Sequence, residues 1–437
     1  MAKKYNSNKL HPLVAVELGS DSLRAMAAEY TADGALRILG VETSNKVCVE
    51  RGVVNNTSNA SYGVNEMLRL LANRVHCGEI LKAFIPLGGR SMKIVIVNSK
   101  RNQIQKQPIS FSLLESMEKE CKQKVEARNP HVAVLALVPL DYNLDGSVQY
   151  EQPDESQEAK WLEVRYVAFV GKKELEQKVM DSFIRIPKHI EHTYARPDVL
   201  LTAFATPEDW TEGVGVLDMG AQTTTLTVYK DHGYIYNKVI AQGGYDITRD
   251  IEQLGISFAH AERLKCQYGC AMAEQVETNH VFRIPAKNAD AGMVVIRSTD
   301  VADIITNRLN QIFDPLMAEL NSLPTIGVLY ITGGASLLMG IEAYLQSKTS
   351  VQVMYGSHAP WLTSDTPDEY CAPNYASLVG TLLMGQSYRQ DHPDEEPEDD
   401  LLKSLRKLRK KFEEQTLTIF TDIQPEEKNI EYYVRRD

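Results

Sequence analysis

Apolar and polar residues along this chain follow a pattern that occurs twice, 201 positions apart. Residues 13–19 and 214–220 each form a short apolar stretch that ends in a carboxylate, one apolar residue and a glycine. An alternating stretch follows each copy, then a turn ending in glycine, then a third stretch. Because period-two alternation between turn residues is typical of strands, the pattern predicts two copies of a three-strand meander.

The loop between the first two strands of each copy carries the candidate chemistry. It contains Gly19, Ser20 and Ser22 in the first copy, and Gly220, Thr223 and Thr224 in the second. Glycine lets backbone approach an anion, and N–H groups and hydroxyls can point at phosphate oxygens. Two such loops facing each other would clamp a triphosphate between two domains.

Two further features extend this hypothesis. The carboxylates that precede the loops, Glu17 and Asp218, could hold the water shell of Mg²⁺. A third apolar stretch, residues 325–332, ends in Gly333 and Gly334. A flat nucleoside could lie against this bare backbone.

Helical periodicity and alternation predict the remaining elements. Helices are expected at 61–75, 112–127, 259–269 and 301–320, and strands within 83–97, at 132–138 and at 162–170. The block 81–174 separates the two meanders and has the pattern of an inserted small α/β module. The block 245–320 is mostly helical.

Composition narrows the function classes. A length of 437 residues suggests roughly three domains, and a net charge of −11 argues against a general nucleic-acid binder. The N-terminal residues lack the apolar core of a signal peptide, and no run approaches the length of a membrane span, so a cytosolic chain is expected. The six cysteines form no CxxC pair, which favours packed thiols over a metal site.

The C-terminal region changes character after Gly385. An acidic, proline-containing linker over 386–400 precedes a basic amphipathic helix predicted at 401–420. Its apolar stripe consists of Leu401, Leu405, Leu408 and Phe412. Such a helix could lie in a membrane surface, enter a partner's groove or stay solvated. Residues 421–437 carry no pattern that we can interpret.

These motifs resemble the actin-like ATPase superfamily and, within it, the FtsA family of bacterial cell-division proteins. Residues 17–22 and 218–224 are similar to the two phosphate loops of that superfamily, and residues 332–336 to its adenosine loop. Residues 51–55, 138–146, 242–250 and 260–271 are similar to FtsA itself. The resemblance spans about residues 10–385.

The resemblance implies an α/β actin-like fold of two duplicated domains with an inserted module of the type called 1C. The implied limits are 1–80 and 175–205 for domain 1A, 81–174 for 1C, 206–244 and 321–385 for 2A, and 245–320 for 2B.

The resemblance also implies ATP and Mg²⁺ as cofactors. Gly244 is expected beside the phosphates, and Glu262 and Lys265 near the ribose and adenine. Two departures concern catalysis: Glu17 stands where the superfamily has aspartate, and Thr225 stands where a carboxylate often positions water. Slow hydrolysis or none is therefore expected, and no catalytic residue is assigned.

FtsA-like proteins polymerise and recruit the tubulin-like FtsZ. The expected partners are thus the FtsZ C-terminal peptide on domain 2B, other copies of the chain, further division proteins and the inner membrane surface at the division site. Arg308 and Arg297 are the candidate contacts for the acidic peptide. The resemblance favours the membrane-surface interpretation of residues 401–412, because proteins of this family end in a membrane-targeting amphipathic helix.

Two other classes remain open. A PilM-like adaptor, which binds a membrane-protein peptide in pilus assembly, shares the inserted domain but generally lacks the basic helix. A sugar kinase or chaperone ATPase shares the superfold, but the chain has no clear aspartate base for a sugar and no long β-rich substrate domain.

Overall fold

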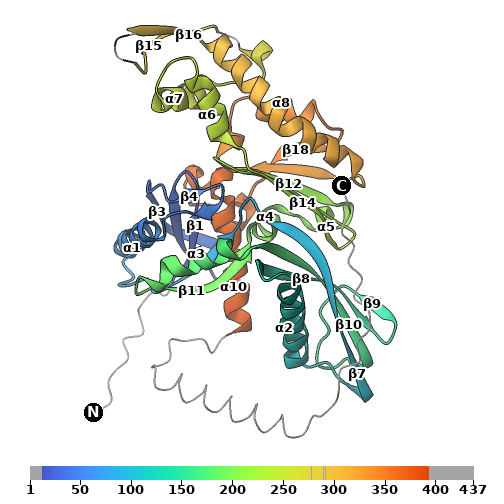
Figure 1. Cartoon of the computed structure of the whole chain (residues 1–437). Helices are drawn as coiled ribbons and strands as arrows, with labels where there is room; N and C mark the ends of the chain where they lie inside the picture. Colours follow the sequence, from blue (N-terminus) through green and yellow to red (C-terminus); the bar gives the residue numbers. More distant parts are fainter. Residues whose placement is uncertain (1–11, 277, 289, 291, 393–437) are drawn as a thin grey trace, which may run out of the picture.

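A computed structural model describes residues 12–392 apart from 277, 289 and 291 (Figure 1). The helix predicted at 401–420 lies outside these residues. The described chain is built on two five-stranded sheets with the same topology, on helices, and on a four-stranded sheet that is inserted in sequence between the last two strands of the first large sheet.

The first sheet has the order β11-β6-β1-β2-β3. The first three strands form an antiparallel meander, and β6 and β11 add in parallel beside β1. Its strands are β1 (Leu13–Leu18), β2 (Leu23–Tyr30), β3 (Leu36–Ser44), β6 (Lys82–Leu87) and β11 (His189–Ala195).

The second sheet repeats this plan with the order β14-β13-β12-β17-β18. Every residue of β12 is buried, as expected for a strand with neighbours on both sides. Its strands are β12 (Val214–Met219), β13 (Thr224–Lys230), β14 (Gly233–Ile240), β17 (Val328–Thr332) and β18 (Gln352–Tyr355). Both predicted meanders are therefore confirmed.

The third sheet has the order β7-β10-β8-β9 and carries one helix, α2 (Phe111–Arg128), on its face (Figure 1). Ser110 caps this helix by accepting a hydrogen bond from the Leu113 N–H. Its strands are β7 (Lys93–Pro108), β8 (Val132–Leu144), β9 (Ser147–Gln149) and β10 (Glu158–Lys172). This is the inserted α/β module that the pattern predicts.

The block after β14 is mostly helical and contains a small hairpin before its last helix. It contains α6 (Gly244–Glu252), α7 (Phe258–Tyr268) and the long α8 (Ser298–Ser322), with the hairpin of β15 (Val281–Pro285) and β16 (Met293–Arg297). Ile305, Leu309 and Ile312 are on the buried face of α8. The periodicity thus predicts α7 and α8 correctly to within three residues at each end.

The remaining helices complete the layers around the sheets. They are α1 (Thr57–Arg74), α3 (Lys173–Ile184), α4 (Arg196–Phe204), α5 (Pro207–Glu212), α9 (Ile341–Gln346) and α10 (Ala376–Asp391), with a short pairing of β4 (Val49–Glu50) and β5 (Val53–Val54).

Two segments belong elsewhere than the implied domain limits place them. Strand β6 falls inside the 81–174 block, yet it pairs with β1, so the inserted module begins after it. Helix α10 falls mostly inside the 321–385 block, yet Leu378 and Leu382 pack in one core with Leu13 and Phe84. These domain boundaries depend on pairing and packing between segments that are distant in sequence. Local periodicity contains no information about such contacts.

Candidate functional site

A cavity of about 400 Å³ lies where the two large sheets face each other. This volume is within the range of small-molecule sites. The first sheet contributes Glu17 and the loop 18–22, and the second contributes Asp218, Gly220 and Thr223. Gly333 and Gly334 close a third side, and Gly244, Glu262 and Lys265 a fourth.

The two loops form the same turn. The Gly19 N–H donates to the Ser22 carbonyl oxygen at 3.1 Å, and the Gly220 N–H donates to the Thr223 carbonyl oxygen at 2.8 Å. A Cβ atom on Gly19 would lie 2.7 Å from that Ser22 oxygen, and one on Gly220 would lie 3.0 Å from the Thr223 oxygen. Glycine is required because these turns are too tight for a side chain.

The double glycine after β17 has two separate roles. Gly333 has a φ of +88°, and a Cβ there would meet the Met219 carbonyl and Asp218, so this glycine is structural. A Cβ on Gly334 would meet nothing within 4 Å, because that position faces the open cavity. Gly334 is therefore the bare backbone against which a flat ligand could lie.

Helices α6 and α7 fix the fourth wall. The Gly244 N–H donates to the Gly220 oxygen at 3.0 Å, which joins α6 to the second turn. Lys265 Nζ donates to the Gly244 oxygen at 2.9 Å and pairs with Glu262 at 2.8 Å. Thr248 shares this network through its hydroxyl. The predicted pair Glu262 and Lys265 thus forms a joined ionic wall of the cavity.

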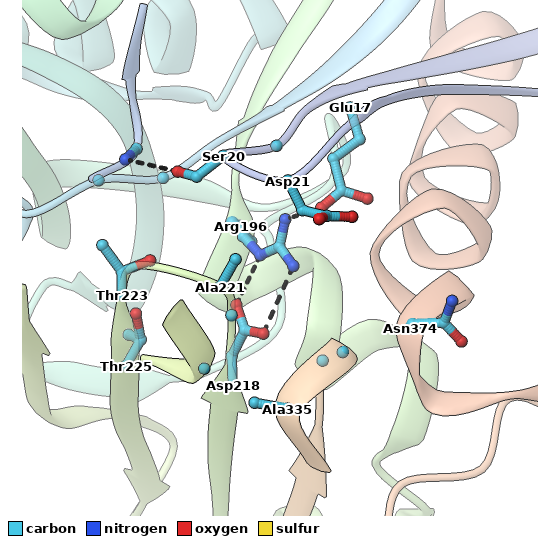
Figure 2. A pocket seen from close by; sticks show the side chains of 18 of the residues that line it. Glu17, Ser20, Asp21, Arg196, Asp218, Ala221, Thr223, Thr225, Ala335 and Asn374 are labelled. Atoms are coloured by element: carbon cyan, nitrogen blue, oxygen red, sulfur yellow. Dashed lines mark hydrogen bonds and ion pairs between the residues drawn. The ribbon is translucent and has the colours of Figure 1, made fainter. Parts of the chain in front are cut away.

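Arg196 is the central charged group of the site. Its Nε–H donates to Asp218 Oδ2 at 2.6 Å, its Nη2 contacts Asp218 Oδ1 at 3.4 Å, and its Nη1 donates to Glu17 Oε1. Figure 2 shows the guanidinium above Asp218, beside the first loop. One side chain therefore bridges the carboxylates of both strands.

This bridge fixes the charges. Burial by itself would raise the pKa of Glu17, but the charges of Arg196 and Arg24 and the hydrogen bond from Arg196 together outweigh it, so the pKa of Glu17 falls below its usual value. Burial opposes the charge on Arg196, yet the two carboxylates raise the pKa of that guanidinium further. Glu17 and Arg196 are therefore both charged at neutral pH.

The donor set does not fit a hydrated Mg²⁺ held between Glu17 and Asp218. The carboxylates are brought together as predicted, but Arg196 already takes oxygens of both. Within the described chain, Glu17 Oε2 is buried without a hydrogen-bond partner, which leaves an acceptor for one water or ligand donor. A cation shared by both carboxylates would have to displace the guanidinium.

Two further hydrogen bonds join the two halves of the molecule, of which the first is built on the sheet that contains β1 and the second on the sheet that contains β12. The Tyr245 hydroxyl donates to Asp21 Oδ1 at 2.7 Å, from α6 to the first loop. The Arg51 N–H donates to Gln222 Oε1 at 2.9 Å, which joins the other side of the first half to the second loop. Together with the Arg196 bridge, these bonds join the two sides of the cavity at three points.

Most of the predicted nucleotide-site residues line the cavity, and Thr224 does not. Thr224 is buried, and its hydroxyl donates to the backbone carbonyl oxygen of Gln242 at 3.0 Å. Thr225 lines the cavity instead. The side chains of Ser20 and Ser22 are engaged within the first half: Ser20 accepts from the Gly52 N–H, and Ser22 from Arg24. Their hydroxyls can still accept or donate further bonds.

The two candidate arginines for a partner peptide differ in their surroundings. Arg308 forms a bidentate pair with Asp250, at 2.6 and 2.7 Å, that joins α8 to α6. Arg297 is exposed at the start of α8. Leu401, Leu405, Leu408 and Phe412 lie outside the described residues.

Sequence reasoning missed Arg196. The available signal was an Arg-Pro pair directly after an apolar strand, since proline is favoured at the first helical positions and the end of a parallel strand is where ligands bind. A cation is unfavourable at the N-terminus of a helix, so Arg196 needs nearby carboxylates.

Comparison with known proteins places the fold. A family model described as type IV pilus assembly protein PilM matches residues 16–278, and one described as cell division protein FtsA matches residues 215–380. FtsA of Escherichia coli K12 is 25% identical over 86% of this chain and 90% of its own length. FtsA of Bacillus subtilis is 23% identical over 78% and 77%.

Solved structures agree. The PilM–PilN type IV pilus biogenesis complex matches with a TM-score of 0.60 and 15% identity, covering 86% of this chain and 99% of that one. MreB5 of Spiroplasma citri bound to ADP matches with a TM-score of 0.50 and 11% identity, covering 89% and 100%. The chain therefore has the actin-like ATPase fold. Within its described part, no helix is long and apolar enough to cross a membrane.

Proposed function

This chain belongs to the family that the type IV pilus assembly protein PilM represents, since that model matches more than half of it, and on this premise we propose that it is an ATP-binding, actin-like adaptor in cell division. In this proposal the adaptor carries nucleotide between its two halves and binds a partner peptide on the 245–320 block. The FtsA relatives, which match it along most of their length, support the cell-division role.

One observation carries the nucleotide part of the proposal. Two equivalent glycine turns, 201 residues apart in sequence, line one cavity together with the bare backbone of Gly334. Backbone N–H groups and hydroxyls from two sides are suited to a chain of phosphates, and the glycine backbone is suited to a flat base. The MreB5 relative bound to ADP supports this use of the fold.

Hydrolysis is a lesser part of the proposal. Thr225 lines the cavity at the position where a carboxylate would position water, so phosphoryl transfer lacks one positioning group. We expect binding with slow hydrolysis at most.

Replacing Gly334 with valine tests the nucleotide site. The new side chain would enter open cavity space without meeting the protein, so the variant should fold and yet block the nucleoside. The affinity for ATP, measured by calorimetry, should fall at least about tenfold in Gly334→Val. The affinity of Gly334→Ala should lie between those of Gly334→Val and the wild type. Equal ATP affinity in wild type and Gly334→Val, with an unchanged melting temperature, would remove this cavity as the site.

The partner and membrane parts rest on the relatives and on sequence. We propose the FtsZ C-terminal peptide as the ligand of the 245–320 block, with self-association into filaments and contacts to other division proteins. Residues 401–412 would hold the protein on the cytoplasmic face of the inner membrane. Flotation with anionic liposomes tests this part: a chain ending at residue 400 should remain soluble, and unchanged partitioning would contradict it.

A second candidate is a PilM-like adaptor that binds a membrane-protein peptide. Two observations favour it: the PilM model matches a longer part of the chain than the FtsA model, and the PilM–PilN complex covers 99% of its own length in the structural match. The choice of peptide separates the two candidates and is tested below.

A further inference from the structure

We propose that Arg196 is the resident cation of this cleft, so that a nucleotide is held here without a divalent metal. This inference rests on the proposed nucleotide site and names what neutralises the phosphates there. It departs from the expectation that Glu17 and Asp218 hold Mg²⁺.

The guanidinium of Arg196 occupies the position that a shared metal ion would take. It lies between the two carboxylates that end equivalent strands and contacts both. A hydrated Mg²⁺ that joined the two strands would use these same oxygens. The guanidinium and the metal therefore compete for one position.

Arg196 is held in place by its surroundings. Both carboxylate side chains are only 10% exposed and that of Arg196 is 22% exposed, so the three charges are largely removed from water. Arg196 also packs over Gly88, where a Cβ would lie 3.2 Å from Arg196 Cδ. Withdrawing the guanidinium would leave two buried carboxylates without the cation that contacts both, which is strongly unfavourable.

Arg196 keeps hydrogen-bond donors for a ligand. A guanidinium has five N–H bonds, and three hydrogen bonds to Glu17 and Asp218 use three of them, so 5 − 3 leaves two. These belong to the Nη atoms of a side chain that lines the same cavity as both loops. Arginine N–H pairs are well suited to phosphate oxygens.

The cavity wall carries a net negative charge. Its lining contains four carboxylates (Glu17, Asp21, Asp218, Glu262) and three cations (Arg24, Arg196, Lys265), a net charge of 3 − 4 = −1. Removing the Arg196 charge would make it −2, and a polyphosphate would then need a divalent cation to approach. Arg196 thus decides whether metal is required.

The test compares nucleotide affinity with and without metal in three proteins. A fluorescent ATP analogue is titrated in EDTA and in excess Mg²⁺ into the wild type, Arg196→Gln and the control Arg389→Gln. Arg389 also forms a bidentate pair, with Glu191 at 2.8 and 2.7 Å, but it is outside the cavity lining. The wild type and the control should bind equally, to within about threefold, in both buffers.

Arg196→Gln should lose at least about tenfold in EDTA and regain affinity with Mg²⁺. Arg196→Lys keeps the charge without the bidentate geometry; it should bind more weakly than wild type and remain independent of metal. If wild-type affinity rises at least about tenfold on adding Mg²⁺, the guanidinium moves aside for the metal and the inference is overturned, while the proposed nucleotide site stands.

A metal-binding readout separates failure of this inference from failure of the nucleotide site. Electron paramagnetic resonance of Mn²⁺ without nucleotide should show no site in the wild type and a new site in Arg196→Gln. Should the wild type bind no nucleotide in either buffer, this Mn²⁺ result alone would still support Arg196 as the resident cation. A stoichiometric wild-type Mn²⁺ site that Asp218→Asn abolishes would overturn it.

Discussion

At the scale of single residues, the charge pattern of the cleft was only half predictable. The spacing before each glycine loop marked Glu17 and Asp218, and the structure brings them together. Arg196 is separated from Glu17 by 179 residues, so no local pattern could pair them. The prediction of Thr224 as a site residue was wrong for a related reason. Thr224 and Thr225 carry the same hydroxyl in sequence, but side chains alternate along β13, so Thr224 is buried and Thr225 faces the cavity.

A buried histidine gives a pH prediction. His358 is 0% exposed, its Nε2 lies 2.8 Å from the Tyr370 carbonyl oxygen, and burial lowers the pKa of its imidazole. The folded state therefore keeps this ring neutral while the unfolded state takes up a proton below its ordinary pKa of about 6.5. The contribution of His358 to the free energy of unfolding is therefore fully present above that pH. It is lost as pH falls, by at most about 1.4 kcal/mol per pH unit.

The measurement is the urea midpoint between about pH 7.5 and 5. His358→Gln should show a flatter decline than the wild type, whereas the control His232→Gln, at an exposed position, should keep the wild-type slope. Parallel curves for His358→Gln and wild type would remove His358 from the pH dependence of stability.

At the scale of elements, local periodicity predicted helices and strands well and their partners less well. Residues 301–320 and 112–127 carry apolar stripes that lie in α8 and α2 with small changes at the ends. The assignment of β6 and α10 to domains failed because β6 pairs with β1 and α10 packs on the first sheet, and both choices depend on distant segments.

The partner prediction belongs to this scale because it concerns one helix. Arg308→Glu would place two carboxylates against each other at Asp250 and disturb the α6–α8 contact, so it would confuse binding with stability. Arg297 is the better probe, because its side chain is exposed and its change leaves that pair intact. If the acidic FtsZ tail binds here, Arg297→Glu should weaken it about tenfold.

Fluorescence anisotropy with the FtsZ tail peptide measures this effect, with Arg90→Glu, an exposed arginine of the first half, as the control. Equal weakening by both variants would indicate general charge attraction and exclude Arg297 as a contact. If the wild type binds no FtsZ tail but binds a pilus membrane-protein peptide, the PilM-like candidate replaces the cell-division one.

At the scale of the whole molecule, the internal repeat was the most informative part of the sequence. Because equivalent loops on duplicated sheets can meet only across the interface of the two halves, the repeat predicted a cleft with two matching walls. The structure has that cleft, and Arg196, Tyr245 and Gln222 join its walls. The pattern could not give these links, because they depend on how the two halves dock.

The central claim is that one nucleotide contacts both halves at once, and hydrogen–deuterium exchange of the wild-type protein with and without ATP tests it most directly. The account predicts slower exchange at residues 19–23, 220–224 and 333–336 together, with no change in the hairpin at 281–297. Protection of only one loop, or of neither, would contradict a nucleotide clamped between the two halves.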